Sequence, residues 1–201
     1  PMLFRVGRDS IRMQRPGLYY GRAVINFCGM LCGFTAVTLI PLAEMTALSF
    51  TGPIFVTIGA AMFLGEVIRI RRMVAIGFGF VGAMIILRPG FADISMGTML
   101  ALASALSIAG ASLVVKKMTE TESATAIVFW MVMMQAPIAL VPMLFVWEMP
   151  TAQTWLWLWM MALAGTAAHV LFTRACSMVE ITSLQPLEFA KLPFAVILAW
   201  L

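Results

Sequence analysis

The chain has 201 residues, of which 62% are hydrophobic and 11% are charged, and its mean hydropathy is +1.00. Soluble domains average about 45–50% apolar and about 25% charged residues. The composition therefore excludes an ordinary water-soluble globule, a disordered chain and a nucleic-acid-binding domain. The net charge is only +4, and the three cysteines are too few and too odd in number for a disulfide framework. The sequence is typical of a membrane protein.

Seven apolar segments are long enough to cross a bilayer as helices, which takes about 20 mostly apolar residues. They are predicted at residues 18–39, 42–64, 70–88, 97–115, 124–147, 154–176 and 180–201. The connections between these segments are short. The expected fold is therefore all-α, a polytopic bundle of membrane helices.

The basic residues predict the orientation of this bundle. If all seven segments cross, one side of the membrane holds eleven of the 13 Lys and Arg residues: Arg5, Arg8, Arg12, Arg15, Arg22, Arg69, Arg71, Arg72, Lys116, Lys117 and Arg174. The other side holds Arg88, and Lys191 lies within the last segment. Because basic loops stay in the cytoplasm, the arginine-rich start of the chain is predicted to be cytoplasmic.

The sequence also contains an internal repeat. A shift of 136 residues aligns Glu44–Leu48 with Glu180–Leu184 and Gly29 with Gly165. The two aligned segments cross in opposite directions, which is the inverted topology of many secondary transporters. The first repeat then lacks two helices before residue 18, and the second lacks one after residue 201. The chain is therefore expected to be an internal fragment, with seven of ten helices visible.

Several segments resemble the EamA-type drug/metabolite transporter superfamily. They are residues 41–53, 63–66, 87–90, 173–175 and 186–193. The resemblance implies ten helices in two inverted five-helix repeats, with residues 1–90 belonging to the first repeat and 95–201 to the second. It implies a secondary transporter, a permease for a small organic metabolite or drug-like molecule, in a bacterial inner membrane. Substrate, direction, coupling ion and oligomeric state stay open.

Interrupted helices in matching positions predict the substrate pathway of such a transporter. Gly52 and Pro53 interrupt one segment, and Pro186 and Pro193 interrupt its counterpart. Each proline removes a backbone N–H and leaves a carbonyl free to face a polar cavity. The alternative is a simple kink that neighbouring groups satisfy.

Charged residues inside the last segment are a second indication of the pathway. Glu188 and Lys191 are three residues apart, and Gln185 lies one turn earlier on the same face. Charges within a membrane are costly and are usually functional or paired. Glu188 is the candidate for proton coupling, and the alternative is an ion pair that only fixes packing. His169, the only histidine, either lines the cavity or forms one interhelical hydrogen bond.

A third group, Glu66, Arg69 and Arg72, is predicted to form an ion-pair cluster that acts as a cytoplasmic gate. Glu44 and Glu180 are expected to cap helix N-termini. The glycines at 77, 79 and 82 match a dinucleotide-binding spacing but lie in an apolar helix, so close helix packing is expected.

The expected partners are a small-molecule substrate and the lipid bilayer, and no cofactor, metal or nucleic acid is indicated. Two alternative functions are a non-transporting assembly subunit and, less favoured, an intramembrane enzyme. A non-transporting assembly subunit does not need buried charges or paired helix breaks. An intramembrane enzyme would need catalytic residues such as a membrane aspartyl pair, whereas Asp9 and Asp93 both lie in loops.

Overall fold

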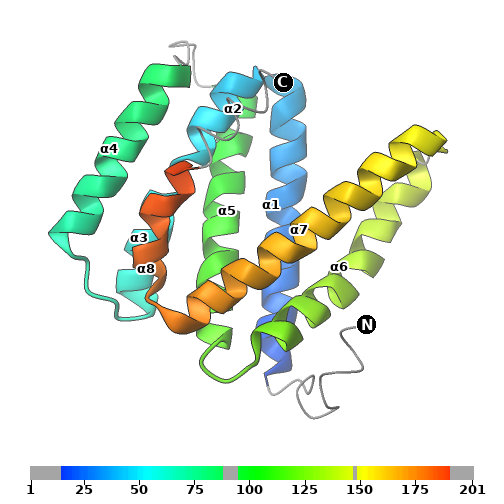
Figure 1. Ribbon diagram of the computed structural model, residues 1–201. Coiled ribbons are helices and arrows are strands. Elements are labelled where there is room, and N and C mark those ends of the chain that lie inside the picture. The colour runs from blue at the N-terminus through cyan, green and yellow to red at the C-terminus, as the bar shows by residue number, and fades with distance from the viewer. Residues whose placement is uncertain (1–14, 88–94, 147–148, 191–201) are drawn as a thin grey trace. The chain divides into compact units, whose positions relative to one another are not determined.

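The computed structural model describes residues 15–87, 95–146 and 149–190, and all of the regular structure in these ranges is helical. The helices are α1 (Pro16–Leu39), α2 (Leu42–Ser49), α3 (Gly52–Phe63), α4 (Ile70–Leu87), α5 (Met96–Met118), α6 (Ala124–Val146), α7 (Ala152–Met178), α8 (Ile181–Leu184) and the 3-10 helix η3 (Gln185–Ala190) (Figure 1). The all-α prediction is confirmed.

Five of the described helical stretches are long and apolar enough to cross a membrane. They are Pro16–Leu39, Glu44–Phe63, Met96–Met118, Ala124–Phe145 and Ala152–Met178. The third predicted span forms α4, a single helix of 18 residues. The seventh is described only as far as Ala190, so its second half lies outside the described residues.

The chain divides into two compact units, and each takes residues from both halves of the sequence. Unit 1 comprises residues 1–23 and 115–178, and unit 2 comprises residues 24–114 and 179–201. Unit 1 therefore holds the start of α1, the end of α5, and α6 and α7. Unit 2 holds α2, α3, α4, α8 and η3, with the larger parts of α1 and α5. The predicted repeats at 1–90 and 95–201 are a different division and stay a prediction.

Small residues let α1 and α5 approach closely in unit 2. Ala36 and Ala101 are fully buried against Ile40, and a Cβ atom at Gly29 would lie 2.9 Å from the Ser107 Cβ. The Ser104 hydroxyl donates to the Gly29 carbonyl at 2.8 Å. Membrane helices pack in this way because lipid supplies no hydrophobic force between them.

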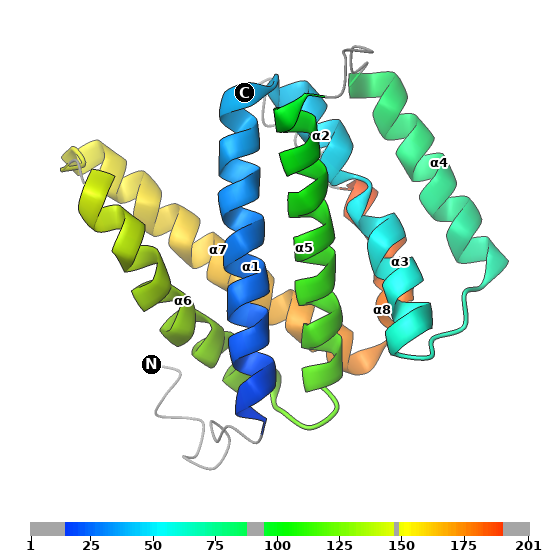
Figure 2. The ribbon, with the colours of Figure 1, turned by 180° about the vertical axis from the view of Figure 1, so that it is seen from behind.

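The predicted interruption at Gly52 and Pro53 separates α2 from α3 (Figure 2). Pro53 lies in the first turn of α3, where its missing N–H costs little. The last turn of α2 tightens, with Thr51 N–H donating to the Leu48 carbonyl at 3.0 Å. The Thr51 hydroxyl donates to the same carbonyl at 2.6 Å. The Leu48 carbonyl therefore accepts two hydrogen bonds from Thr51, one from its backbone and one from its side chain.

The segment that follows α7 changes from α-helix to 3-10 helix at Gln185, one residue before Pro186. The buried Gln185 side-chain amide donates to the Ile181 carbonyl at 3.1 Å. At the first break, the Thr51 hydroxyl likewise donates to a backbone carbonyl, that of Leu48. Within unit 2, α8 and η3 pack along α3 and run in the opposite direction (Figure 1).

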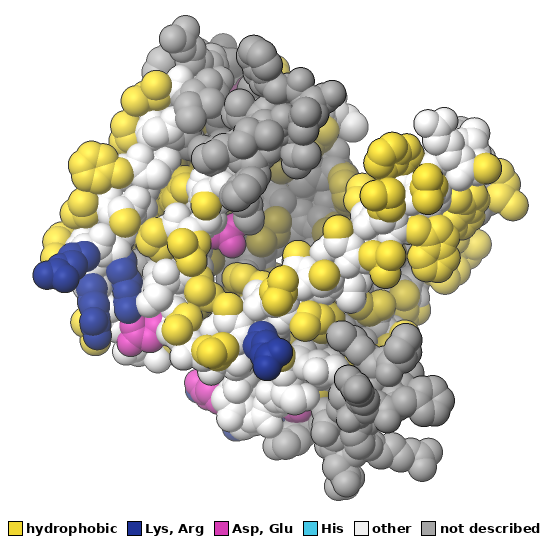
Figure 3. Space-filling model, viewed as in Figure 1, with side chains coloured by type: hydrophobic (Ala, Val, Ile, Leu, Met, Phe, Trp, Pro, Cys, Tyr) yellow, Lys and Arg dark blue, Asp and Glu magenta, His cyan; other side chains and the backbone are white. Residues whose placement is uncertain are grey.

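Hydrophobic side chains cover the visible surfaces of α4 and α7, and basic side chains gather at one end of α4 (Figure 3). On α7 the exposed apolar side chains form an almost continuous run: Trp155, Leu156, Trp157, Leu158, Trp159, Met160, Met161 and Leu163. Such a surface suits contact with lipid rather than with water.

Candidate functional site

A tight turn after α3 places the first residue of the site. Gly65 has a φ of 67°, a left-handed conformation that residues with a Cβ adopt only at a cost. The turn lets the Glu66 N–H donate back to the Ala60 carbonyl at 3.2 Å. The Gly65 backbone therefore ends α3 and directs the Glu66 side chain out of the helix toward α8.

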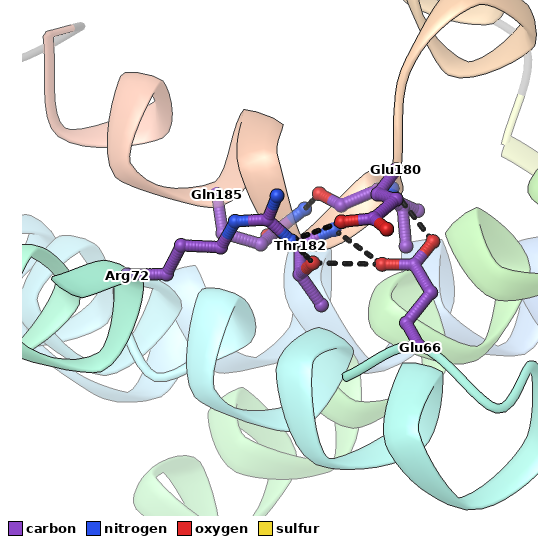
Figure 4. A network of polar contacts seen from close by, with 6 residues as sticks. Glu66, Arg72, Glu180, Thr182 and Gln185 are labelled. Carbon is purple, nitrogen blue, oxygen red and sulfur yellow. Dashed lines mark hydrogen bonds and ion pairs between the residues drawn. The ribbon is translucent and has the colours of Figure 1, made fainter. Parts of the chain in front are cut away.

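The Glu66 carboxylate caps the N-terminus of α8. One oxygen, Oε1, accepts the Ile181 N–H at 2.9 Å. The other, Oε2, accepts the Thr182 N–H at 3.1 Å and the Thr182 hydroxyl at 2.7 Å (Figure 4). The free N–H groups of a helix N-terminus favour an anion there. Glu66 satisfies two of them from a distance of more than 100 residues along the chain.

Arg72, in the first turn of α4, completes the network. Its guanidinium forms an ion pair with Glu180 and donates to the Thr182 hydroxyl at 2.6 Å. Thr182 thus contacts both the carboxylate of Glu66 and the guanidinium of Arg72 (Figure 4). We call Glu66, Arg72, Glu180 and Thr182 the α8 network. It ties the end of α3 and the start of α4 to the start of α8.

The structure brings together two of the three predicted gate residues. Glu66 and Arg72 meet through Thr182, whereas the exposed Arg69 side chain makes no hydrogen bond or ion pair with the described residues. The prediction that Glu180 caps its own helix is wrong. Glu180 occupies the N-cap position, but its side chain makes no capping bond, because Glu66 already accepts those N–H groups.

Glu44 lies in the first turn of α2, but its carboxylate accepts no N–H of that helix among the described residues, and its partner lies on another helix. Oε1 accepts the Thr98 hydroxyl of α5 at 3.0 Å. Glu44 is therefore a link between α2 and α5 as well as a first-turn acid. The side chain of Pro41, the N-cap residue, supplies no capping bond.

The predicted pathway residues of the last segment are partly described. Gln185 is buried, and Pro186 and Glu188 are half-buried on η3. Lys191 and Pro193 lie outside the described residues. Gly52 and Pro53 lie at the start of α3 in the same unit. His169 belongs to unit 1, where its side chain is exposed on α7.

An aromatic contact holds η3 in place. Phe189 stacks on Phe50, with ring centroids 5.2 Å apart, and both pack against Ile76 of α4. A Cβ atom at Gly79 would lie 2.5 Å from the Phe189 ring. Gly79 therefore provides the space for the Phe189 ring, so close helix packing accounts for this glycine. It does not account for Gly77 or Gly82, where a Cβ atom would meet nothing within 4 Å.

An apolar groove of about 250 Å³ lies between α3 and α5 in unit 2. Its lining residues are Phe55, Ile58, Gly59, Met62, Phe63, Leu106, Ala109, Gly110 and Leu113. None of the predicted pathway residues lines it. In the part of the chain that the structure describes, no group of three His, Cys, Asp or Glu side chains could hold a metal ion.

The geometry at Gly65 gives a first testable prediction. Gly65→Val should lower stability by about 1–2 kcal/mol, because valine pays the cost of the left-handed backbone and shifts Glu66. The readout is the thermal unfolding midpoint in detergent. Gly77→Val is the matched control, since a Cβ at Gly77 would meet nothing within 4 Å. Equal midpoints for the two variants would contradict the role assigned to Gly65.

Sequence reasoning missed two parts of this site. Thr182 carries no signal of its own, because a threonine in a helix is common. The positive φ of Gly65 did have a signal, since a glycine directly after an apolar helix is typical of a helix C-terminus.

Comparisons with known proteins agree with these features. A model of the EamA-like transporter family matches residues 2–88 and 95–201. The chain is 33% identical over 204 residues to a riboflavin transporter of Vibrio cholerae, covering 100% of this chain and 68% of that protein. It is 27% identical over 200 residues to an S-adenosylmethionine uptake transporter of Rickettsia bellii, covering 100% of this chain and 69% of that protein.

One solved crystal structure shares the fold, with a TM-score of 0.79 and 20% sequence identity, over 94% of this chain and 67% of the other. This chain thus spans about two thirds of the proteins that it matches. The family match covers nearly all of its residues, and its helices are apolar enough to cross a membrane. The chain therefore belongs to the EamA-like transporter family, and it is an integral membrane protein that transports small metabolites and is not an enzyme.

Proposed function

We propose that this protein carries a cofactor-like metabolite across the bacterial inner membrane by alternating access, with riboflavin as the first substrate to test. The relative from Vibrio cholerae is named for riboflavin, and the one from Rickettsia bellii for S-adenosylmethionine. Both molecules join a heteroaromatic ring system to a hydroxyl-bearing sugar or sugar alcohol. A site for either needs polar groups inside the membrane and room for a flat ring.

The observation that carries the proposal is the pair of helix breaks in unit 2. At each break, α2–α3 and α8–η3, a side chain donates a hydrogen bond to a backbone carbonyl: Thr51 to Leu48, and Gln185 to Ile181. Irregular backbone within a membrane is tolerated where it is buried in protein or lines a polar cavity. We assign the substrate pathway to these breaks, with Gln185 and Glu188 on the second.

The antiparallel course of α3 and α8–η3 supports the two inverted repeats at 1–90 and 95–201. The 136-residue shift also aligns Pro186 with Phe50, which lies in the junction between α2 and α3. Alternating access would then rock one repeat against the other around the paired breaks. In this arrangement the basic loops face the cytoplasm.

The α8 network is the gate in this proposal. Its four residues are connected through Thr182, and together they hold the start of α8 against the α3–α4 turn. Hydrogen bonds and ion pairs of this kind can exchange partners between two discrete arrangements, unlike a packed apolar core. Breaking them would release α8 and η3, on which Gln185 and Glu188 lie.

The transport function is tested in liposomes that contain the purified protein. We expect saturable uptake or efflux of labelled riboflavin, and riboflavin should raise the thermal unfolding midpoint, because a ligand of the folded state stabilises it. S-adenosylmethionine is measured in parallel. Transport of S-adenosylmethionine without riboflavin would reassign the substrate. Binding of neither, in a protein that unfolds cooperatively, would contradict the cofactor-like class.

Glu188→Gln tests the assignment of the pathway. We expect transport to fall at least about tenfold with an unchanged unfolding midpoint, because the variant keeps the shape of the side chain and loses only its titratable charge. Glu120→Gln is the matched control, since the Glu120 carboxylate pairs with Lys117 at 2.9 Å on an exposed surface. Normal transport by Glu188→Gln would remove Glu188 from the mechanism.

A further inference from the structure

Unit 1 contains a buried arginine that forms no ion pair with any carboxylate of the described residues. Arg22 lies about one and a half turns into α1, and only 5% of its surface is exposed. Its Nη2 donates to the Met131 Sδ of α6 at 3.0 Å. Its Nε is buried and has no hydrogen-bond partner in the described part of the chain. A thioether is a weak acceptor, so this contact compensates little of the cost of burial.

The acidic side chains of unit 1 that the structure describes, Glu120 and Glu122, have other partners. The buried Glu122 accepts the Arg15 backbone N–H at 3.2 Å. Glu120 pairs with Lys117. Among the described residues, no carboxylate forms an ion pair with Arg22. Burying an arginine without a counter-charge lowers the stability of the folded protein unless a bound group neutralises it.

Three further polar atoms of unit 1 are also buried without a hydrogen-bond partner among the described residues. They are the hydroxyl oxygens of Tyr19, Thr121 and Thr173. Thr173 lies on α7 and Thr121 lies in the turn between α5 and α6. Buried polar groups in proteins are almost always satisfied, so unit 1 is unusual in holding four polar atoms for which the described residues supply no partner.

We propose that Arg22 binds the oxyanion group of a ligand, a phosphate or a carboxylate, inside unit 1. The Nε–H of a guanidinium and an N–H of its neighbouring Nη point in parallel and match two oxygens of such a group. The second hydrogen on Nη2 can keep its contact with Met131. The proposal concerns a different unit from the paired helix breaks and does not depend on which metabolite is transported.

The anion has two possible sources, a soluble metabolite or the headgroup of an acidic lipid. Matched probes address the first source in the full chain purified in detergent. Riboflavin 5′-phosphate and riboflavin differ by one phosphate, and S-adenosylmethionine and its decarboxylated form differ by one carboxylate. We expect at least one anionic member to bind about tenfold or more tightly than its partner, which is the effect of one charged hydrogen-bonded pair.

Nanodiscs address the second source. If a lipid headgroup is bound, the unfolding midpoint should be higher in nanodiscs that contain phosphatidylglycerol than in pure phosphatidylcholine. In either case the preference must disappear in Arg22→Met and persist in Arg174→Met. Arg174 is the control because it is an exposed arginine on α7 of the same unit.

The ligand-free variant separates a binding role from a structural one. Arg22→Met removes an uncompensated charge, so its midpoint without ligand should equal or exceed that of the unaltered chain. Should the variant fail to fold, Arg22→Lys keeps the charge and loses the paired N–H groups, and the anion preference should fall about tenfold. Identical preferences in the unaltered chain and in both Arg22 variants, for every probe and lipid, would overturn the proposal.

Discussion

Glu66→Ala should destabilise the protein more than any other single truncation in the α8 network. It leaves the buried N–H groups of Ile181 and Thr182 without an acceptor and removes the acceptor of the Thr182 hydroxyl. Losing charged hydrogen bonds of this kind costs about 2–3 kcal/mol. The thermal unfolding midpoint in detergent should fall by roughly 5–10 °C. Transport should fall with it if the network is the gate.

Two variants show whether charge or hydrogen bonding matters at this position. Glu66→Gln keeps one acceptor oxygen and should recover part of the stability. Glu44→Ala is the comparison, because the Glu44 carboxylate accepts one interhelical hydrogen bond, from the Thr98 hydroxyl. We expect Glu44→Ala to cost about 1 kcal/mol. If Glu66→Ala were no worse than Glu44→Ala, the cap on α8 would not contribute as the geometry indicates.

Charge reversal at Arg72 should have the largest effect on transport. In the native protein Arg72 attracts Glu180 through an ion pair. Arg72→Glu instead places a third carboxylate beside those of Glu66 and Glu180. Like charges at such short range repel, even where solvent screens them. We expect the start of α8 to detach from α4 and transport to fall at least about tenfold.

The double variant Arg72→Glu, Glu180→Arg restores opposite charges and should recover a substantial part of the transport rate. Arg71→Glu is the matched control, because Arg71 is exposed and its side chain makes no contact with the network. Initial rates in liposomes are the measurement. Equal losses in the single and double variants would show that the two side chains do not act as a pair.

The helices of this protein are largely predictable from its sequence, because each apolar run is long and the runs are separated by polar or basic residues. The break at Gly52 and Pro53 was predictable for a local reason, since proline cannot continue the hydrogen bonds of α2. Pro186 makes the position of the second break predictable, but not that the backbone continues as a 3-10 helix from Gln185. Proline removes a donor, and packing decides how the backbone responds.

The site was predictable only in part. Glu66 and Arg72 are predictable neighbours, because both are charged and lie in the short segment between two apolar helices. The sequence did not reveal that their common partner is Thr182, because that contact joins residues about 110 positions apart. Arg22 was counted only as a basic residue near the cytoplasm. Its burial depends on α6 and on Met131, which no local pattern relates to α1.

The cap on α8 also sets an order on biosynthesis. Glu66 and Ile181 are 115 residues apart, so at about 5–20 residues per second the ribosome needs roughly 6–23 s to make the partner that Glu66 awaits. During that interval α4, α5, α6 and α7 are synthesised. The carboxylate must stay hydrated in the α3–α4 turn until then. The turn is thus fixed only after α7 has been synthesised, and a nascent chain stopped before Ile181 exposes it to cellular quality control.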